Sequence, residues 1–83
     1  MNRLSSLANA GRILAEHFLE HKSYRESPRA VTRSALLWIK EISTALRAEI
    51  NAEKSDVKAM SEAIDALDLL LEVVTLVNEE NMK

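Results

Sequence analysis

Two histidines in the segment EHFLEH have the residue type and the spacing of metal ligands. His17 and His21 are one helical turn apart, and Glu16 and Glu20 lie next to them as possible carboxylate donors. Imidazole and carboxylate groups are ligands that zinc accepts in proteins. The chain has no third His and no Cys, so the sequence marks no further ligand. We therefore expect a structural role for both histidines, with no metal and no cofactor.

Nucleophilic catalysis has even less support in the sequence. A seryl nucleophile needs a base and an oxyanion site, and the chain contains neither a GxSxG motif nor a glycine-rich phosphate loop. No feature distinguishes Asp65 or Glu72 from ordinary exposed acids. A chain of 83 residues also leaves little room for an enclosed pocket. We therefore expect that the protein is not an enzyme.

The composition predicts that helices position nearly every side chain. The 83 residues include one Gly and one Pro, which is unfavourable for sheets and long loops. Apolar residues recur every three or four positions and indicate helices over about 3–22, 28–50 and 56–78. Ser27 and Ser55 are the expected N-cap residues, and Pro28 suits the first helical position.

The connections between these helices predict the architecture. The turn NAEK is short enough to fold the second and third helices into an antiparallel hairpin, and HKSYRE is the other linker. Gly11, inside the first helix, is expected to let another helix approach closely. We predict an all-α fold with a single domain over residues 1–83, in which an N-terminal helix packs across a helical hairpin.

The third predicted helix is apolar on more faces than two neighbours cover. One heptad seam comprises Val57, Met60, Ile64, Leu67, Leu71 and Val74, and a second comprises Ala59, Ala63, Ala66, Leu70, Val73 and Val77. Leu69 and Leu76 lie outside both seams. We expect them to contact another chain together with Val73, which predicts a homodimeric helical bundle. The alternative is a monomer with scattered exposed leucines.

The second predicted helix carries a basic row on its outer face, which we name the basic ridge. The ridge comprises Arg25, Arg29, Arg33, Lys40 and Arg47. Residues 1–47 carry eight Lys or Arg against four Asp or Glu, whereas residues 48–83 carry three against nine. The ridge can bind an anionic partner. Alternatively, it flanks the acidic row of the third helix, across the hairpin or across a dimer.

That acidic row of the third helix, which we name the acidic stripe, comprises Asp65, Asp68, Glu72 and Glu79. A row of carboxylates can imitate a nucleic-acid backbone, but four acids on a solvated helix face are also common.

Two apolar residues of the second predicted helix are further candidates for a contact. Trp38 shares a seam with Ala35 and Ile42, so it is expected to anchor either the core or an interface. Leu37 lies between Arg33 and Lys40 on the outer face. We expect it at the centre of any docking surface, and a lone exposed leucine is the alternative.

These features favour a non-enzymatic protein–protein interaction module that acts as a homo-oligomer. Its class would be a small intracellular regulator, adaptor, inhibitor or chaperone with a protein partner. The alternative is a nucleic-acid, phosphate or nucleotide binder that uses the basic ridge, although stacking aromatics and a helix-turn-helix motif are missing.

The expected location of the protein follows from three absences in the sequence. The chain has no Cys, which suits a reducing cytoplasm, and its first 21 residues lack the continuous apolar run of a signal peptide. The apolar stretch over 67–77 is too short and too often interrupted to span a membrane. We therefore expect a cytoplasmic protein without a membrane partner.

Overall fold

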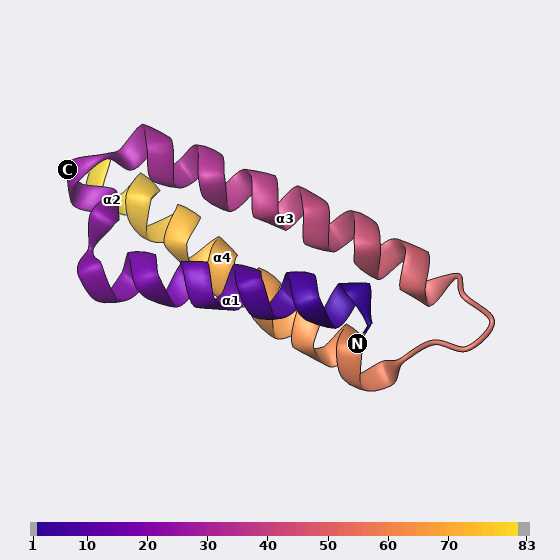
Figure 1. The fold of residues 1–83 in the computed structure, drawn as a ribbon. Helices are drawn as coiled ribbons and strands as arrows, with labels where there is room; N and C mark the ends of the chain where they lie inside the picture. Colours follow the sequence, from indigo (N-terminus) through magenta and orange to yellow (C-terminus); the bar gives the residue numbers. More distant parts are fainter. Residues whose placement is uncertain (1, 82–83) are drawn as a thin grey trace.

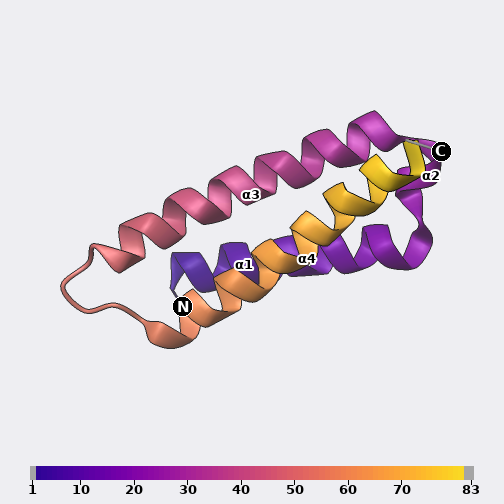
Figure 2. The same cartoon turned by 180° about the vertical axis from the view of Figure 1, so that it is seen from behind.

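The computed structural model describes residues 2–81, and its elements in this range are helices only. They are α1 (Arg3–His21), α2 (Ser23–Glu26), α3 (Pro28–Ile50) and α4 (Val57–Asn81). Figures 1 and 2 show that α3 and α4 run in opposite directions as a hairpin, while α1 lies alongside α4 and runs in the same direction. The predicted all-α class is confirmed, and the described helices include a fourth, α2, that the sequence did not indicate.

The chain between α1 and α3 is more ordered than a linker. Helix α1 ends at His21 because Lys22 adopts a left-handed conformation with φ 52° and ψ 36°. The chain then forms the single turn of α2, which brings Tyr24 into the core with only 6% of its surface exposed. Lysine rarely signals such a helix end, since glycine or asparagine usually occupies this conformation.

The helix starts differ in part from those expected. The Asn2 side chain caps α1 by accepting from the Leu4 backbone N–H at 2.7 Å. The prediction that Ser55 caps the last helix is wrong, because Asp56 Oδ1 accepts from the Ala59 backbone N–H at 3.1 Å. Ser27 occupies the N-cap position of α3 next to Pro28, as expected, but its side chain makes no capping hydrogen bond.

One carboxylate joins the ends of three helices. Glu49, in the last turn of α3, accepts through Oε1 from Asn2 Nδ2 at 3.1 Å and from the Asp56 backbone N–H at 2.9 Å. Ser55 Oγ donates to the Glu49 carbonyl at 2.9 Å. The starts of α1 and α4 are therefore both tied to the end of α3, which orders the turn between the hairpin helices.

The core contains one of the two predicted seams of α4. The second seam, over residues 59–77, is buried along its whole length. The first seam is not: Met60, Leu67 and Val74 are partly buried, while Val57, Ile64 and Leu71 are exposed by 74%, 50% and 51%. The small side chains of Ala59, Ala63 and Ala66 explain this choice, because they let α1 and α3 approach the α4 backbone closely.

Gly11 has the close contact that the sequence predicted. A Cβ atom added to Gly11 would lie 2.6 Å from Ile42 Cδ1 on α3, well below an ordinary contact distance. It would also lie 3.5 Å from Leu70 Cδ1 on α4. The missing side chain therefore allows α1 to pack against both helices of the hairpin.

Across residues 2–81, none of the helices combines the length and the apolar character needed to cross a membrane.

Candidate functional site

The outer side of the α3–α4 hairpin exposes a set of large apolar side chains, which we name the hairpin face. It comprises Leu36 and Ile50 of α3 and Val57, Ile64 and Leu71 of α4. The α4 members recur every seven residues, and the two α3 members are fourteen apart. Such heptad spacing keeps side chains on one side of each helix. The face is backed by partly buried apolar residues that pack on the core.

The two rows of the hairpin face border the same junction between α3 and α4. Thr32, one turn before Leu36, lines a surface hollow together with Val74 and Val77 of α4. Val74 is adjacent to Leu71 on its helix. Contacts to α1 involve the other side of each hairpin helix: Trp38 of α3 shares a hollow with α1 residues, and Glu62 of α4 accepts a hydrogen bond from Ser5 of α1. The hairpin face therefore lies away from α1.

The residues predicted to meet another chain on α4 lie elsewhere. Val73 is 0% exposed and belongs to the core, so it has no surface to give to a partner. Leu69 and Leu76 are half-buried and pack against the core. They follow Glu62 at steps of seven, and Ser5 Oγ of α1 donates to Glu62 Oε2 at 3.3 Å.

Helix α1 therefore covers the side of α4 that carries both leucines. The prediction that Leu69 and Leu76 form the uncovered third face is wrong, because that face lies at Val57, Ile64 and Leu71. Whether Leu69 and Leu76 touch another chain with their remaining surface stays a prediction.

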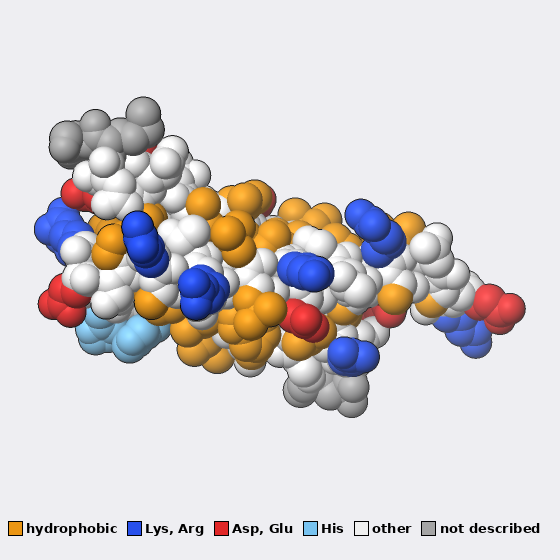
Figure 3. Space-filling view, turned by 90° about the horizontal axis from the view of Figure 1, so that it is seen from above, with side chains coloured by type: hydrophobic (Ala, Val, Ile, Leu, Met, Phe, Trp, Pro, Cys, Tyr) orange, Lys and Arg blue, Asp and Glu red, His pale blue; other side chains and the backbone are white. Residues whose placement is uncertain are grey.

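The basic ridge lies on the exposed side of α3. All five of its residues are exposed, and Arg25, which belongs to α2, forms an ion pair with Glu80 at 3.7 Å. The other four, Arg29, Arg33, Lys40 and Arg47, have no ion pair with any residue within 2–81. Figure 3, which looks onto α3, shows Lys and Arg side chains in a row with hydrophobic side chains on both sides.

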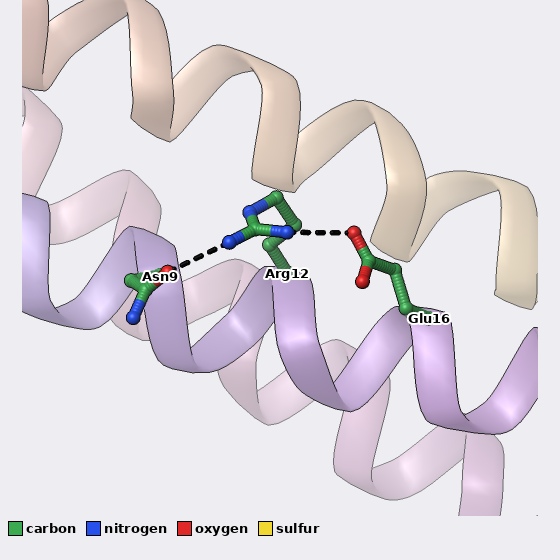
Figure 4. A network of polar contacts seen from close by, with 3 residues as sticks. All are labelled: Asn9, Arg12 and Glu16. Atoms are coloured by element: carbon green, nitrogen blue, oxygen red, sulfur yellow. Dashed lines mark hydrogen bonds and ion pairs between the residues drawn. The ribbon is translucent and has the colours of Figure 1, made fainter.

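Arg12 on α1 shows the contrasting case of a cation with partners on its own helix. Its guanidinium donates to Glu16 Oε1 at 2.7 Å and to Asn9 Oδ1 at 2.8 Å (Figure 4). Such an exposed pair contributes about 0.2–1 kcal/mol to stability, and together with the Asn9 contact it engages both terminal nitrogens of Arg12. The ridge cations of α3 form no ion pair with a carboxylate of the described chain. They are therefore stronger candidates than Arg12 for a contact with an external partner.

The acidic stripe is exposed along α4 and is likewise unpaired with the described residues. None of Asp65, Asp68, Glu72 and Glu79 forms an ion pair with residues 2–81. Among the residues that the structure describes, the one pair that links a ridge residue to α4 uses Glu80, which is not part of the stripe. The basic ridge and the acidic stripe therefore do not pair with each other across the hairpin. Of the two pairings that the sequence suggested, pairing between the ridge of one chain and the stripe of another remains.

A second apolar patch lies between α1 and α3. Leu37 is exposed by 58%, in agreement with its expected outward position, and Ile13 of α1 is exposed by 54%. Trp38 is half-buried rather than fully shielded, and it lines a hollow with Ile13 and His17. Trp38 thus contributes one part of its surface to the core and another to this patch. A role for Leu37 and Trp38 in partner binding stays a prediction.

The two histidines are close to each other, but residues 2–81 supply no further ligand group beside them. The rings of His17 and His21 lie 4.4 Å apart between centroids and are tilted by 44°. Both side chains are exposed near the end of α1. In the part of the chain that the structure describes, no three His, Asp or Glu side chains are grouped as a metal site.

Comparisons of the chain with protein-family models, with curated proteins and with solved structures gave no match. Sequence reasoning missed the hairpin face because it assigned the first α4 seam to an intramolecular neighbour. The heptad spacing of Val57, Ile64 and Leu71 was visible, but the sequence did not show which seam α1 and α3 would leave uncovered.

Proposed function

We propose that the chain is a non-enzymatic protein-interaction module that self-associates through the hairpin face. One observation carries the proposal: of the seven large apolar side chains that are exposed in the described chain, five belong to this face. Large apolar patches are rare on the surfaces of monomers and usually mark an interface. A small helical chain commonly completes its core by forming a symmetric dimer. The absence of cysteine supports a reducing, cytoplasmic setting.

The burial available at this face supports a stable contact. Fully burying a Val, Leu or Ile side chain contributes about 1.5–3 kcal/mol. Since Leu36, Ile64 and Leu71 are already about half-covered, each contributes about 1 kcal/mol when a partner covers the rest. A two-fold interface counts each side chain twice. Two charged substitutions in one chain therefore introduce four unpaired charges into the dimer contact.

The test compares two matched double variants by sedimentation equilibrium at micromolar concentration. Ile64→Lys with Leu71→Lys changes the hairpin face, and Ile13→Lys with Leu37→Lys changes the patch between α1 and α3, where exposure is similar. We expect the first variant to be monomeric and the second to associate like wild type. Circular dichroism checks that both retain helices. A monomeric wild-type protein, or a hairpin-face variant that associates normally, would overturn the proposal.

The second candidate function is nucleic-acid or phosphate binding by the basic ridge. The favouring observation is that four exposed ridge cations of α3 have no ion pair with residues 2–81. Binding to phosphates releases counterions, so the affinity of such a protein falls steeply as salt rises. Fluorescence anisotropy with labelled single-stranded and duplex nucleic acid tests this candidate. If the candidate is right, the protein binds the labelled nucleic acid with an affinity that falls as salt rises. The double variant Arg29→Glu with Arg33→Glu should then abolish this binding.

A further inference from the structure

The hairpin face has oppositely charged edges. In a helix, successive residues are rotated by about 100°, so Lys40 lies about 40° beyond Leu36, on the side of α3 away from α4. By the same geometry Asp68 lies about 60° beyond Leu71, on the side of α4 away from α3. Both charged residues are exposed. The apolar face is therefore bordered by the basic ridge along α3 and by the acidic stripe along α4.

Two of the four charges on each edge also occur at matching heights along the hairpin. The heights follow from the turn, which joins Ile50 to Val57, and from the hollow in which Thr32 meets Val74 and Thr75. Counted along the two antiparallel helices, Lys40 lies at the height of Asp68. Arg29 lies at the height of Glu79.

Two symmetric arrangements can cover this face with a second copy. A two-fold axis perpendicular to the helices stacks α3 on the partner's α3, so that basic edge meets basic edge and acidic edge meets acidic edge. An axis parallel to the helices stacks α3 on the partner's α4, so that basic meets acidic on both sides. The parallel axis also keeps every residue at its own height. Lys40 then faces Asp68 of the partner subunit, and Arg29 faces Glu79 of the partner subunit.

We propose that two copies form an antiparallel four-helix bundle in which α3 of each chain packs against α4 of the other. This inference rests on the proposed function and specifies its partner and geometry. Like charges directly opposite each other are unfavourable, whereas complementary edges steer association and fix its orientation. The chain itself is the partner that offers a basic and an acidic edge at the required heights. Every pair of neighbouring helices in this bundle is antiparallel.

Two charge-reversed variants test the arrangement. The ridge-reversed variant carries Arg29→Glu with Lys40→Glu, and the stripe-reversed variant carries Asp68→Lys with Glu79→Lys. All four residues are exposed and have no ion pair with residues 2–81, so the reversals should spare the fold of the single chain. Each variant alone places like charges along both edges of its dimer. We expect its dissociation constant at low salt to rise about tenfold or more.

A mixture of the two variants provides the control for folding. In the mixed dimer both edges again join opposite charges, so it should form about as tightly as the wild-type dimer. A variant that had merely lost its fold could not be rescued in this way. Native mass spectrometry counts the mixed and unmixed dimers, and sedimentation equilibrium gives their affinities. High salt should reduce the difference in dissociation constant between each variant dimer and the wild-type dimer, because it screens the charges on the edges.

The opposite results separate this geometry from the proposed function. Reversed variants that dimerise as tightly as wild type would overturn the geometry and leave self-association intact. A ridge-reversed chain that binds wild type more tightly than wild type binds itself would show α3 packed on α3, and would also overturn it. A wild-type protein that stays monomeric would overturn the proposed function, and this inference with it.

Discussion

Gly11→Ala is a substitution in which two opposing effects can be separated. Alanine is favoured over glycine inside a helix by about 1 kcal/mol, so the substitution would stabilise α1 alone. In the folded chain the added Cβ would lie 2.6 Å from Ile42 Cδ1, and Ile42 is fully buried. Overpacking of a core costs about 1–3 kcal/mol. We expect the free energy of unfolding to fall by about 1 kcal/mol, within a range of about 0–2 kcal/mol.

Ile42→Val removes the atom that the new methyl group meets. Alone, this substitution should lower the free energy of unfolding by about 0.5–1.5 kcal/mol, because it leaves a small cavity. The next neighbours of the added Cβ, Leu70 Cδ1 at 3.5 Å and Trp38 Cε3 at 3.6 Å, are at ordinary contact distances. In the double variant the gain in helix propensity therefore offsets the cavity. We expect stability close to wild type and a coupling energy of about 1–3 kcal/mol.

Urea unfolding followed by circular dichroism measures the four free energies. All four proteins must be compared at one concentration, since self-association stabilises the folded state. A change of 1 kcal/mol shifts the midpoint by about 1 M urea for a chain of this size. The reasoning fails if Gly11→Ala is more stable than wild type, or if the two substitutions are additive.

Two further residues give separate predictions. Asp56→Ala should lower the free energy of unfolding by about 0.5–2 kcal/mol, since Asp56 Oδ1 accepts from the Ala59 N–H. Ser55→Ala should lower it by less, because Ser55 does not cap α4. Equal losses of stability in urea unfolding would contradict this assignment of the cap. Trp38 should show acrylamide quenching between that of free and of buried indole, because it is half-buried on the side of the molecule that faces α1. Its emission should therefore stay constant when dilution dissociates the hairpin face, and a shift to the spectrum of free indole would place Trp38 in the interface.

Local sequence signals were sufficient to predict the main helices and the charged rows. The scarcity of glycine and proline, the apolar spacing and the Pro28 start all act within one segment of chain. The α3 part of the basic ridge and the acidic stripe also follow from helical periodicity alone, because residues three and four apart share a side of the helix. For the same reason the outward position of Leu37 could be predicted before any neighbour was known.

The end of α1 and the start of α4 needed the folded chain. Lys22 adopts a left-handed conformation that its residue type does not favour, and the following turn buries Tyr24. Ser55 and Asp56 are both good capping residues by type. Asp56 takes the cap while Ser55 donates to the Glu49 carbonyl, and that choice depends on where α3 ends relative to α4.

Tertiary packing alone decided which apolar face of α4 stays exposed. Periodicity separates the two seams and the pair Leu69 and Leu76, but it cannot say which neighbour covers each of them. Helices α1 and α3 converge on the alanine-rich seam because its small side chains permit the closest approach. Helix α1 then covers the side of α4 that carries Leu69 and Leu76. The outer part of the other seam, at Ile64 and Leu71, stays exposed and forms part of the hairpin face.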